Sequence, residues 1–323
     1  MSHNILVIGE LDEGSASATT LELLAGASEI ASGGNVSVTL LGTGASQAVG
    51  ACAGANTAYA SDDAEYDDFR GDQWIVAIQS AVESEKPDVI LIGQSIVGRE
   101  VGPRLSHKLG TAVAMDCVSI SDEGGFIKAT RPCFGGNAMA TYGFSTSPAI
   151  ATVRAKSFEV IEGGSGPTTS TELPAASQSR TEIIATEAAT SEGLQIQDAT
   201  VVVTGGRGLG DAEAFGEMES IASAIGLDKA AVGASRAAVD LGWYPPSQQV
   251  GLTGKVVTPD LYLAVAVSGA SQHMAGCSGS KTIVGINRDE EANIWSFSRY
   301  GIIGDYKQIV PALIEELKKA SGN

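Results

Sequence analysis

Residues 198–226, DATVVVTGGRGLGDAEAFGEMESIASAIG, carry the pattern of a buried strand, a glycine-rich turn and an amphipathic helix. The apolar run Thr200–Thr204 is typical of a strand in a parallel sheet, and Gly205–Gly208 follows it directly. A helix is expected from about Ala212 to Ile225. Because parallel strands are joined by helical crossovers, this unit predicts an α/β domain. Its turn could offer free N–H groups to a phosphate, although glycines also serve simple tight turns.

The same alternation of short apolar runs and helical patterns continues along the rest of the chain. In the C-terminal half, further strands are expected at Ala230–Val232, Leu261–Val267 and Thr282–Ile286, with a last helix near Tyr306–Lys319. In the N-terminal half, strands are expected at Ile5–Ile8, Val36–Leu41 and Val89–Ile92, followed by a helix at Arg99–Leu109. Both halves therefore show the rhythm of βαβ units.

A stretch rich in Ser, Thr, Pro and Gly runs from Gly163 to Gly193 and contains few large apolar residues. Such a stretch buries little surface, so we interpret it as a hinge or linker in which Thr181–Ala185 could add one more strand. The length of 323 residues suits about two domains. We therefore predict an α/β protein with an N-terminal domain at 1–190, built on a Rossmann-like parallel sheet, and a doubly wound C-terminal domain at 191–323.

Charge and cysteine content exclude several classes of function. The chain has 20 Lys and Arg against 38 Asp and Glu, and its net charge of -18 disfavours binding to nucleic acid and to anionic membrane surfaces. No apolar run approaches the ~18 residues of a membrane-spanning helix, and the N-terminal MSHNILVIGEL lacks the basic region of a signal peptide. The four scattered cysteines form no CxxC pair, so we expect mostly buried free thiols, no metal site and a cytoplasmic or similarly reducing location.

Four loops with ligand-binding chemistry follow the expected strands of the C-terminal half. They combine glycines with hydroxyl, amide and cationic side chains, at 205–208, 233–240, 250–255 and 267–274. Strand ends in a doubly wound sheet converge on one crevice, so we predict a site there for an extended anionic nucleotide. Arg207 offers a cation to a pyrophosphate, and His273 offers an imidazole that can stabilise charge on a redox ring. No GxSxG, GxxxxGK[ST] or HExxH motif is present, so no catalytic residue is expected.

Several separate motifs, in order and at fitting spacing, resemble the α subunit of electron-transfer flavoproteins. In the C-terminal half they are GGRG, GASRAAVDLGW, QQVGLTGKVVTPDLYLAVAVSGASQH, KTIVGIN and YGIIGDY, and in the N-terminal half DVILIGQSIVGREVGPRL, RPCFGGNAMATY and PAIATVR. The resemblance implies an FAD-binding C-terminal domain in a subunit that carries electrons without catalysing a reaction of its own. It also implies a heterodimer with a β subunit that binds AMP or a second FAD, and an acyl-CoA dehydrogenase or related flavoenzyme as electron donor.

The resemblance also implies roles for individual residues. Arg207, Ser235 and Ser268 would hold the FAD pyrophosphate and its surroundings. Arg236 would lie against the flavin as a cation, and Thr253 would donate its hydroxyl toward flavin N5.

Residues of two later segments complete the expected site. Gln272 and His273 would belong to the flavin-binding loop, with His273 near the pyrimidine carbonyl. Asn287 and Asp305 would address the adenosine end. The full set of expected cofactor contacts is Arg207, Ser235, Arg236, Val250, Gly251, Leu252, Thr253, Ser268, Gly269, Ala270, Ser271, Gln272, His273, Asn287 and Asp305.

This chain departs from the family pattern at two places. Leu252 stands where the family commonly has Gln, so one polar contact near the flavin is lost. The segment Arg288–Trp295 replaces a loop that often contains two prolines, which could reshape the adenosine pocket or a partner surface.

Three alternatives to a plain electron carrier stay open. The chain could belong to an NADH-oxidising, flavin-bifurcating complex, whose distinguishing residues lie largely in the partner. An NAD(P)-dependent dehydrogenase would need an acidic residue about twenty residues after the glycine turn, which is near Asp228, but the turn does not fit GxGxxG in register. The third alternative is a flavin-free structural subunit or nucleotide sensor, in which Leu252 has damaged the site.

Overall fold

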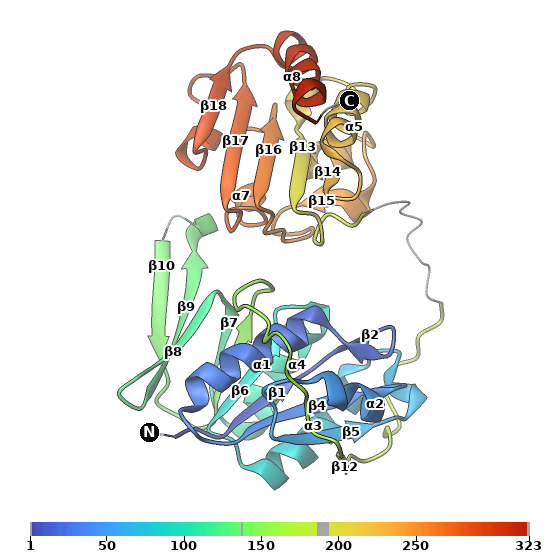
Figure 1. The fold of residues 1–323 in the computed structure, drawn as a ribbon, viewed down its shortest axis with the longest axis vertical. Helices are drawn as coiled ribbons and strands as arrows, with labels where there is room; N and C mark the ends of the chain where they lie inside the picture. The colour runs from blue at the N-terminus through green and yellow to red at the C-terminus, as the bar shows by residue number, and fades with distance from the viewer. Residues whose placement is uncertain (1, 137, 186–193, 322–323) are drawn as a thin grey trace. The chain divides into compact units, whose positions relative to one another are not determined.

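A computed structural model describes residues 2–136, 138–185 and 194–321 (Figure 1). The chain divides into two compact units, Met1–Cys133 with Met139–Thr186, and Phe134–Ala138 with Glu187–Asn323. The domain boundary predicted near residue 190 falls within 186–193 and so lies outside the described residues.

The first unit is built on a seven-stranded parallel sheet in the order β12-β5-β4-β1-β6-β11-β7. Its strands are β1 (Ile5–Ile8), β4 (Val36–Leu41), β5 (Thr57–Ser61), β6 (Val89–Gly93), β7 (Val113–Cys117), β11 (Ala149–Val153) and β12 (Thr171–Glu172). The three strands predicted in this half are confirmed as β1, β4 and β6, and the parallel α/β class is confirmed with them.

Side chains along β1 alternate between two apolar layers. Ile5 and Val7 pack on the face that α1 (Ala18–Ala31) covers, while Leu6 and Ile8 pack on the face of α3 (Gly71–Glu85) and α4 (Ile96–Leu109). All four side chains are at most 1% exposed. A parallel sheet covered on both faces needs such continuous apolar strands, which is why the sequence shows unbroken runs there.

Two local predictions in this half need correction. The helix α4 begins at Ile96 and not at Arg99, because the hydroxyl of Ser95 accepts a hydrogen bond from the N–H of Gly98 at 3.0 Å and caps the extra turn. The segment Thr181–Ala185 forms no strand. The chain joins the sheet edge earlier, at β12, where the following Leu173 is buried, whereas Ile184 is 95% exposed and gains no packing.

The chain segment that follows β7 and precedes β11 forms a three-stranded antiparallel sheet, which was not predicted. It consists of β8 (Ser119–Glu123), β9 (Phe126–Cys133) and β10 (Ala138–Gly143), in the order β10-β9-β8. Gly124 and Gly125 join β8 to β9 with φ angles of 67° and 94°, the left-handed backbone that a tight hairpin turn requires.

The second unit contains a six-stranded parallel sheet in the order β15-β14-β13-β16-β17-β18. Counted along the chain, this order is 3-2-1-4-5-6, so the predicted doubly wound sheet is confirmed. Its strands are β13 (Val201–Gly205), β14 (Ala230–Ser235), β15 (Gln249–Val250), β16 (Leu261–Val265), β17 (Thr282–Asn287) and β18 (Tyr300–Ile303).

The two faces of this sheet are covered differently. The long helices α5 (Phe215–Ile225) and α8 (Tyr306–Ser321) pack on the face that carries Val203 and Leu263 (Figure 1). The opposite face carries Val202 and Tyr262, and it is covered mainly by irregular segments and the one-turn helix α7 (Ser271–Met274). The short strands and α-helices not yet named are β2 (Leu11–Asp12), β3 (Ser15–Ala16), α2 (Ala45–Ala48) and α6 (Arg236–Asp240).

Two further predictions concern the state of the cysteines and the presence of a membrane-spanning helix. The thiols of Cys52, Cys117 and Cys277 are buried, Cys133 is half-buried, and all four are free. Within the described ranges, no helix combines the length and apolar character needed to cross a membrane.

Candidate functional site

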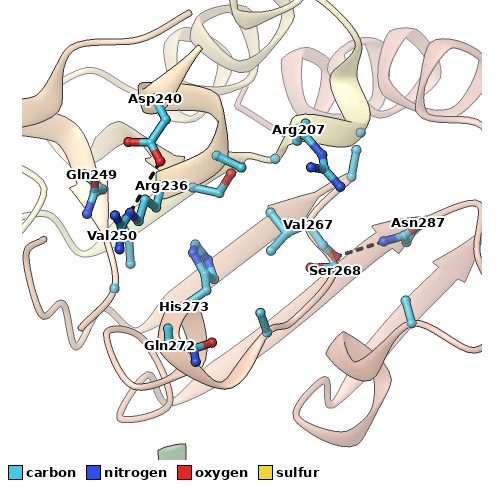
Figure 2. Close-up of a pocket in the computed structure, with 18 of the residues that line it drawn as sticks. Arg207, Arg236, Asp240, Gln249, Val250, Val267, Ser268, Gln272, His273 and Asn287 are labelled. Carbon is cyan, nitrogen blue, oxygen red and sulfur yellow. Dashed lines mark hydrogen bonds and ion pairs between the residues drawn. The ribbon is translucent and has the colours of Figure 1, made fainter. Parts of the chain in front are cut away.

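A cavity of about 780 Å³ opens where the strand order of the second unit reverses, at the carboxyl ends of β13, β14 and β16. Its walls come from the four loops that the sequence singled out and from the segment after β17 (Figure 2). The predicted convergence of these loops on one crevice is therefore found in the structure.

The turn after β13 is held against the end of β16. Gly206 donates its N–H to the carbonyl of Val265 and Gly208 donates to that of Ala266, so the expectation of free N–H groups is wrong at these two positions. A Cβ at Gly206 would lie 2.1 Å from the carbonyl oxygen of Ala266. Ala266 itself has a φ of 55°, which ends β16 before the predicted limit of Val267.

A short 3-10 helix at Arg207–Leu209 follows the turn, and α5 begins only at Phe215, later than the predicted Ala212. The positive end of the α5 dipole is therefore not at the glycine turn. The side chain of Arg207 lies at the cavity (Figure 2) and forms no ion pair with any described residue. The cation, rather than the backbone of this turn, is what the first loop offers to a ligand.

The second loop provides one buried hydroxyl and one exposed cation. The Oγ atom of Ser235 is buried and has no hydrogen-bond partner within the described ranges, although the residue precedes α6. Arg236 is exposed, and its Nε lies 3.4 Å from the Oδ2 atom of Asp240 one helical turn later (Figure 2). An exposed pair of this kind contributes at most ~1 kcal/mol, so Arg236 can turn to another anion at little cost.

The third loop is fastened to the fourth. Leu252 donates its N–H to the carbonyl of Gln272 over 2.8 Å, and Gly251 adopts a φ of 142° to let the chains approach. The side-chain amide of Gln249 donates to the hydroxyl of Thr253 over 3.1 Å. Leu252 is 62% exposed, so this loop brings an apolar surface and an oriented hydroxyl to the same side of the cavity.

His273 lies on α7 in the fourth loop and is only 7% exposed. Its Nε2 atom is 2.8 Å from the hydroxyl oxygen of Tyr262, and its Nδ1 atom makes no hydrogen bond of normal geometry with the described residues. Burial lowers the pKa of His273 to about 4, and the backbone of Val250 opposes that shift weakly. The imidazole is therefore neutral at pH 7.

The segment after β17 closes the cavity on its far side. The amide of Asn287 donates to the carbonyl of Val267 over 2.9 Å and its oxygen accepts the N–H of Asp289, so this side chain braces two loops. Trp295 donates its indole N–H to the carbonyl of Asp289 over 2.8 Å and fills the space left by Gly285 and Gly301. The departure from the family pattern at Arg288–Trp295 thus forms an ordered wall that carries Arg288 and Asp289.

All but three of the predicted contact residues line this cavity. Gly269 and Ser271 do not, and Asp305 lines an adjoining cavity of about 330 Å³ that Arg207 and Asn287 also border. Asp228, the acidic residue that a dehydrogenase would require, lines neither cavity. Five further lining residues belong to the four predicted loops but were not named as contacts, namely Gly206, Gly208, Ala237, Asp240 and Val267. The lining residues outside those loops and outside the named contacts are Gln249, Ala266, Arg288, Asp289 and Ala292.

Two of the residues not named as contacts could have been found from their spacing in the sequence. Asp240 stands four residues after Arg236 on one helix, and Gln249 stands four residues before Thr253. The complete wall holds three arginines against two aspartates in a chain with a net charge of -18. The excess of cations at this one place favours an anionic ligand.

Comparison with known proteins gives a consistent result over both units. A family model described as "Electron transfer flavoprotein domain" matches residues 5–185, and one described as "Electron transfer flavoprotein FAD-binding domain" matches residues 195–278. The chain is 35% identical to "Electron transfer flavoprotein subunit alpha" of Bacillus subtilis, over 99% of this chain and 98% of that protein. It is 36% identical to the protein of the same name from Mycobacterium leprae, over 98% and 99%.

Two further similarities were found. The chain is 35% identical to "Protein FixB" of Clostridium saccharobutylicum, over 98% of this chain and 96% of that protein. A solved glycotransferase of kitacinnamycin aligns over 99% of this chain and 92% of its own, but with a TM-score of 0.28 and 12% identity it does not indicate a shared fold.

Proposed function

Because the chain belongs to the family of electron transfer flavoprotein α subunits, we propose that its second unit binds FAD in the 780 Å³ cavity and that it carries electrons as one half of a heterodimer. Bound FAD would supply the redox chemistry, by taking up and releasing electrons. The observation that carries the proposal is the convergence of four strand-end loops on one cavity, whose wall includes two buried polar atoms without a hydrogen-bond partner in the described part of the chain.

The chemistry of the cavity fits this cofactor. The Oγ of Ser235 and the Nδ1 of His273 are buried without a partner among the described residues, which is uncommon unless a ligand completes the hydrogen bonding. The volume lies within the ~300–1,000 Å³ that small-molecule and cofactor sites occupy. The excess of arginine suits a diphosphate, because guanidinium groups bind its oxygens with charge-assisted hydrogen bonds.

The residues divide into three groups, for the diphosphate, the flavin and the adenosine end. We assign Arg207, Ser235 and Ser268 to the diphosphate, since they lie at or just after the carboxyl ends of the neighbouring strands β13, β14 and β16. Thr253 and Arg236 are assigned to the flavin, with the exposed side chain of Leu252 as apolar cover for the ring system. Asp305 and Asn287 stay assigned to the adenosine end, since both border the adjoining smaller cavity.

The proposal extends to partners and location. Relatives named "subunit alpha" support a β subunit as the partner, which would bind AMP or a second FAD. We propose an acyl-CoA dehydrogenase or related flavoenzyme as the electron donor, a cytoplasmic location, and a boundary near residue 190 between the N-terminal and FAD-binding domains. Four free cysteines are compatible with a reducing compartment.

The test is to co-express the chain with its β subunit, record the visible spectrum of the purified complex, and count FAD and AMP released on denaturation. One FAD and one AMP per complex would support the electron carrier. Two FAD, with loss of flavin colour on adding NADH, would support the bifurcating alternative. A colourless complex that does not take up added FAD would refute both.

The same complex with Arg207→Gln and Ser235→Ala provides the link to this cavity. We expect it to retain less FAD while the heterodimer and its AMP are unchanged. Unchanged FAD content in this double variant would place the cofactor elsewhere.

A further inference from the structure

Tyr262 lies behind the cavity wall, on the central strand β16. Its side chain is fully buried, with 0% exposure, and does not border the cavity itself. Its hydroxyl oxygen is 2.8 Å from the Nε2 atom of His273, which does border the cavity (Figure 2). The side chains of Thr204 and Cys277 lie beside the same phenol. The phenol therefore contacts the imidazole from the protein side, opposite to any ligand.

The tautomer of His273 decides which of these two residues donates in the hydrogen bond between them. Burial raises the pKa of Tyr262 well above 10, so the phenol keeps its proton. A neutral imidazole has one donor nitrogen and one acceptor nitrogen, and Nε2 is the acceptor if Tyr262 donates to it. The backbone of Val250 favours a protonated ring, although Nδ1 makes no hydrogen bond of normal geometry with the described residues. With Nε2 turned toward Tyr262, Nδ1 is the nitrogen left to carry the proton.

We propose that Tyr262 is a positioning residue that donates its phenol proton to Nε2 and so holds His273 as the neutral tautomer protonated at Nδ1. The ring then presents a donor, and no net charge, at the cavity wall. The tautomer is a property of this chain alone, whereas its consequence for the flavin rests on the proposed function.

The buried setting gives Tyr262 control over the tautomer. The Nε2 atom has the Tyr262 hydroxyl as its hydrogen-bond partner, and the low exposure of His273 leaves little water to replace it. In Tyr262→Phe the ring keeps its packing but loses the donor to Nε2, so the preference for a proton on Nδ1 is weakened. A neutral imidazole without a directing partner populates both tautomers.

Nitrogen NMR of the histidine rings tests the assignment directly. The chain contains three histidines, so the signals of His273 in ¹⁵N-histidine-labelled full-length chain, in complex with its β subunit, are identified by their loss in His273→Gln. At pH 7 we expect a protonated signal at Nδ1 and an unprotonated signal at Nε2. In Tyr262→Phe we expect both signals to move toward each other as the second tautomer becomes populated.

A second tyrosine of the same unit provides a matched control. Tyr244→Phe removes a phenol from the same unit, one that stacks on Phe215 outside the cavity, and should leave the His273 signals unchanged. A protonated Nε2 in the wild-type chain would overturn the proposal even if Tyr262→Phe does not fold. Identical His273 signals in wild-type and Tyr262→Phe would also overturn it. Because flavin content is counted separately, a chain without FAD that shows the expected tautomer would refute the proposed function and not this assignment.

Discussion

The side-chain amide of Gln249 donates a hydrogen bond to the hydroxyl oxygen of Thr253 over 3.1 Å, across the end of β15. A hydroxyl that accepts from one side keeps its own proton to donate on another. Gln249 is buried, whereas Thr253 is exposed at the cavity, so the pair orients a donor toward the space assigned to the ligand.

Replacing Thr253 with Val should weaken FAD binding while leaving the fold intact, because Val keeps the shape and loses the donor. A hydrogen bond of net ~0.5–1.5 kcal/mol corresponds to a rise in Kd of about two- to tenfold. The measurement is a flavin titration of the heterodimer freed of its cofactor. Thr253→Ser retains the hydroxyl and should stay close to the wild type, and equal losses in both variants would show that the methyl group rather than the donor matters.

Arg207→Gln should weaken FAD binding more strongly than Thr253→Val. Arg207 forms no ion pair within the described ranges, so its removal affects the ligand without breaking an internal ion pair there. Loss of a charge-assisted hydrogen bond, at ~1.5–3 kcal/mol, predicts a Kd about ten- to hundredfold higher and less sensitive to salt. Arg299→Gln is the matched control, since Arg299 lies over the ring of Tyr300 and away from the cavity. Equal effects of the two variants would point to a general change in charge.

Gly206→Ala should destabilise the second unit. The added Cβ would lie 2.1 Å from the carbonyl oxygen of Ala266, so one of the two strand ends must move. Overpacking of this kind costs ~1–3 kcal/mol in the free energy of unfolding, which denaturant titration measures. Gly216→Ala on α5 meets no atom within 4 Å and should be neutral or stabilising by up to ~1 kcal/mol. A Gly206→Ala chain as stable as the wild type would mean that the turn relaxes freely.

The sheet of the second unit and the place of the cavity could be predicted because both follow from strand periodicity. Apolar runs such as Val201–Thr204 identify buried parallel strands, and parallel strands bring their carboxyl ends to one edge. The loops at those ends could therefore be placed together without knowing any contact between them.

The details that escaped prediction depend on tertiary contacts. Ala266 takes a left-handed φ that alanine seldom adopts, at the point where its backbone packs against Gly206 and Gly208. The edge strand formed at Thr171–Glu172, because a partner strand, β5, and a buried site for Leu173 exist there. The link between Tyr262 and His273 joins two elements that are close in the chain but on different layers, and no periodicity indicates it.

The buried imidazole of His273 should make stability depend on pH between about 4 and ~6.5. Its native pKa is about 4, whereas an unfolded chain has a histidine pKa near 6.5. Below ~6.5 the unfolded state takes up a proton that the native state refuses, so the free energy of unfolding falls as the pH falls and levels off below about 4. At ~1.4 kcal/mol per pH unit, the loss over the whole window approaches ~3 kcal/mol.

Urea titrations at a series of pH values should show this slope in the wild type and a shallower one in His273→Gln. His107→Gln, which alters an exposed histidine, should keep the wild-type slope. Equal slopes in the wild type and His273→Gln would show that the imidazole is charged, or solvated, in the native state.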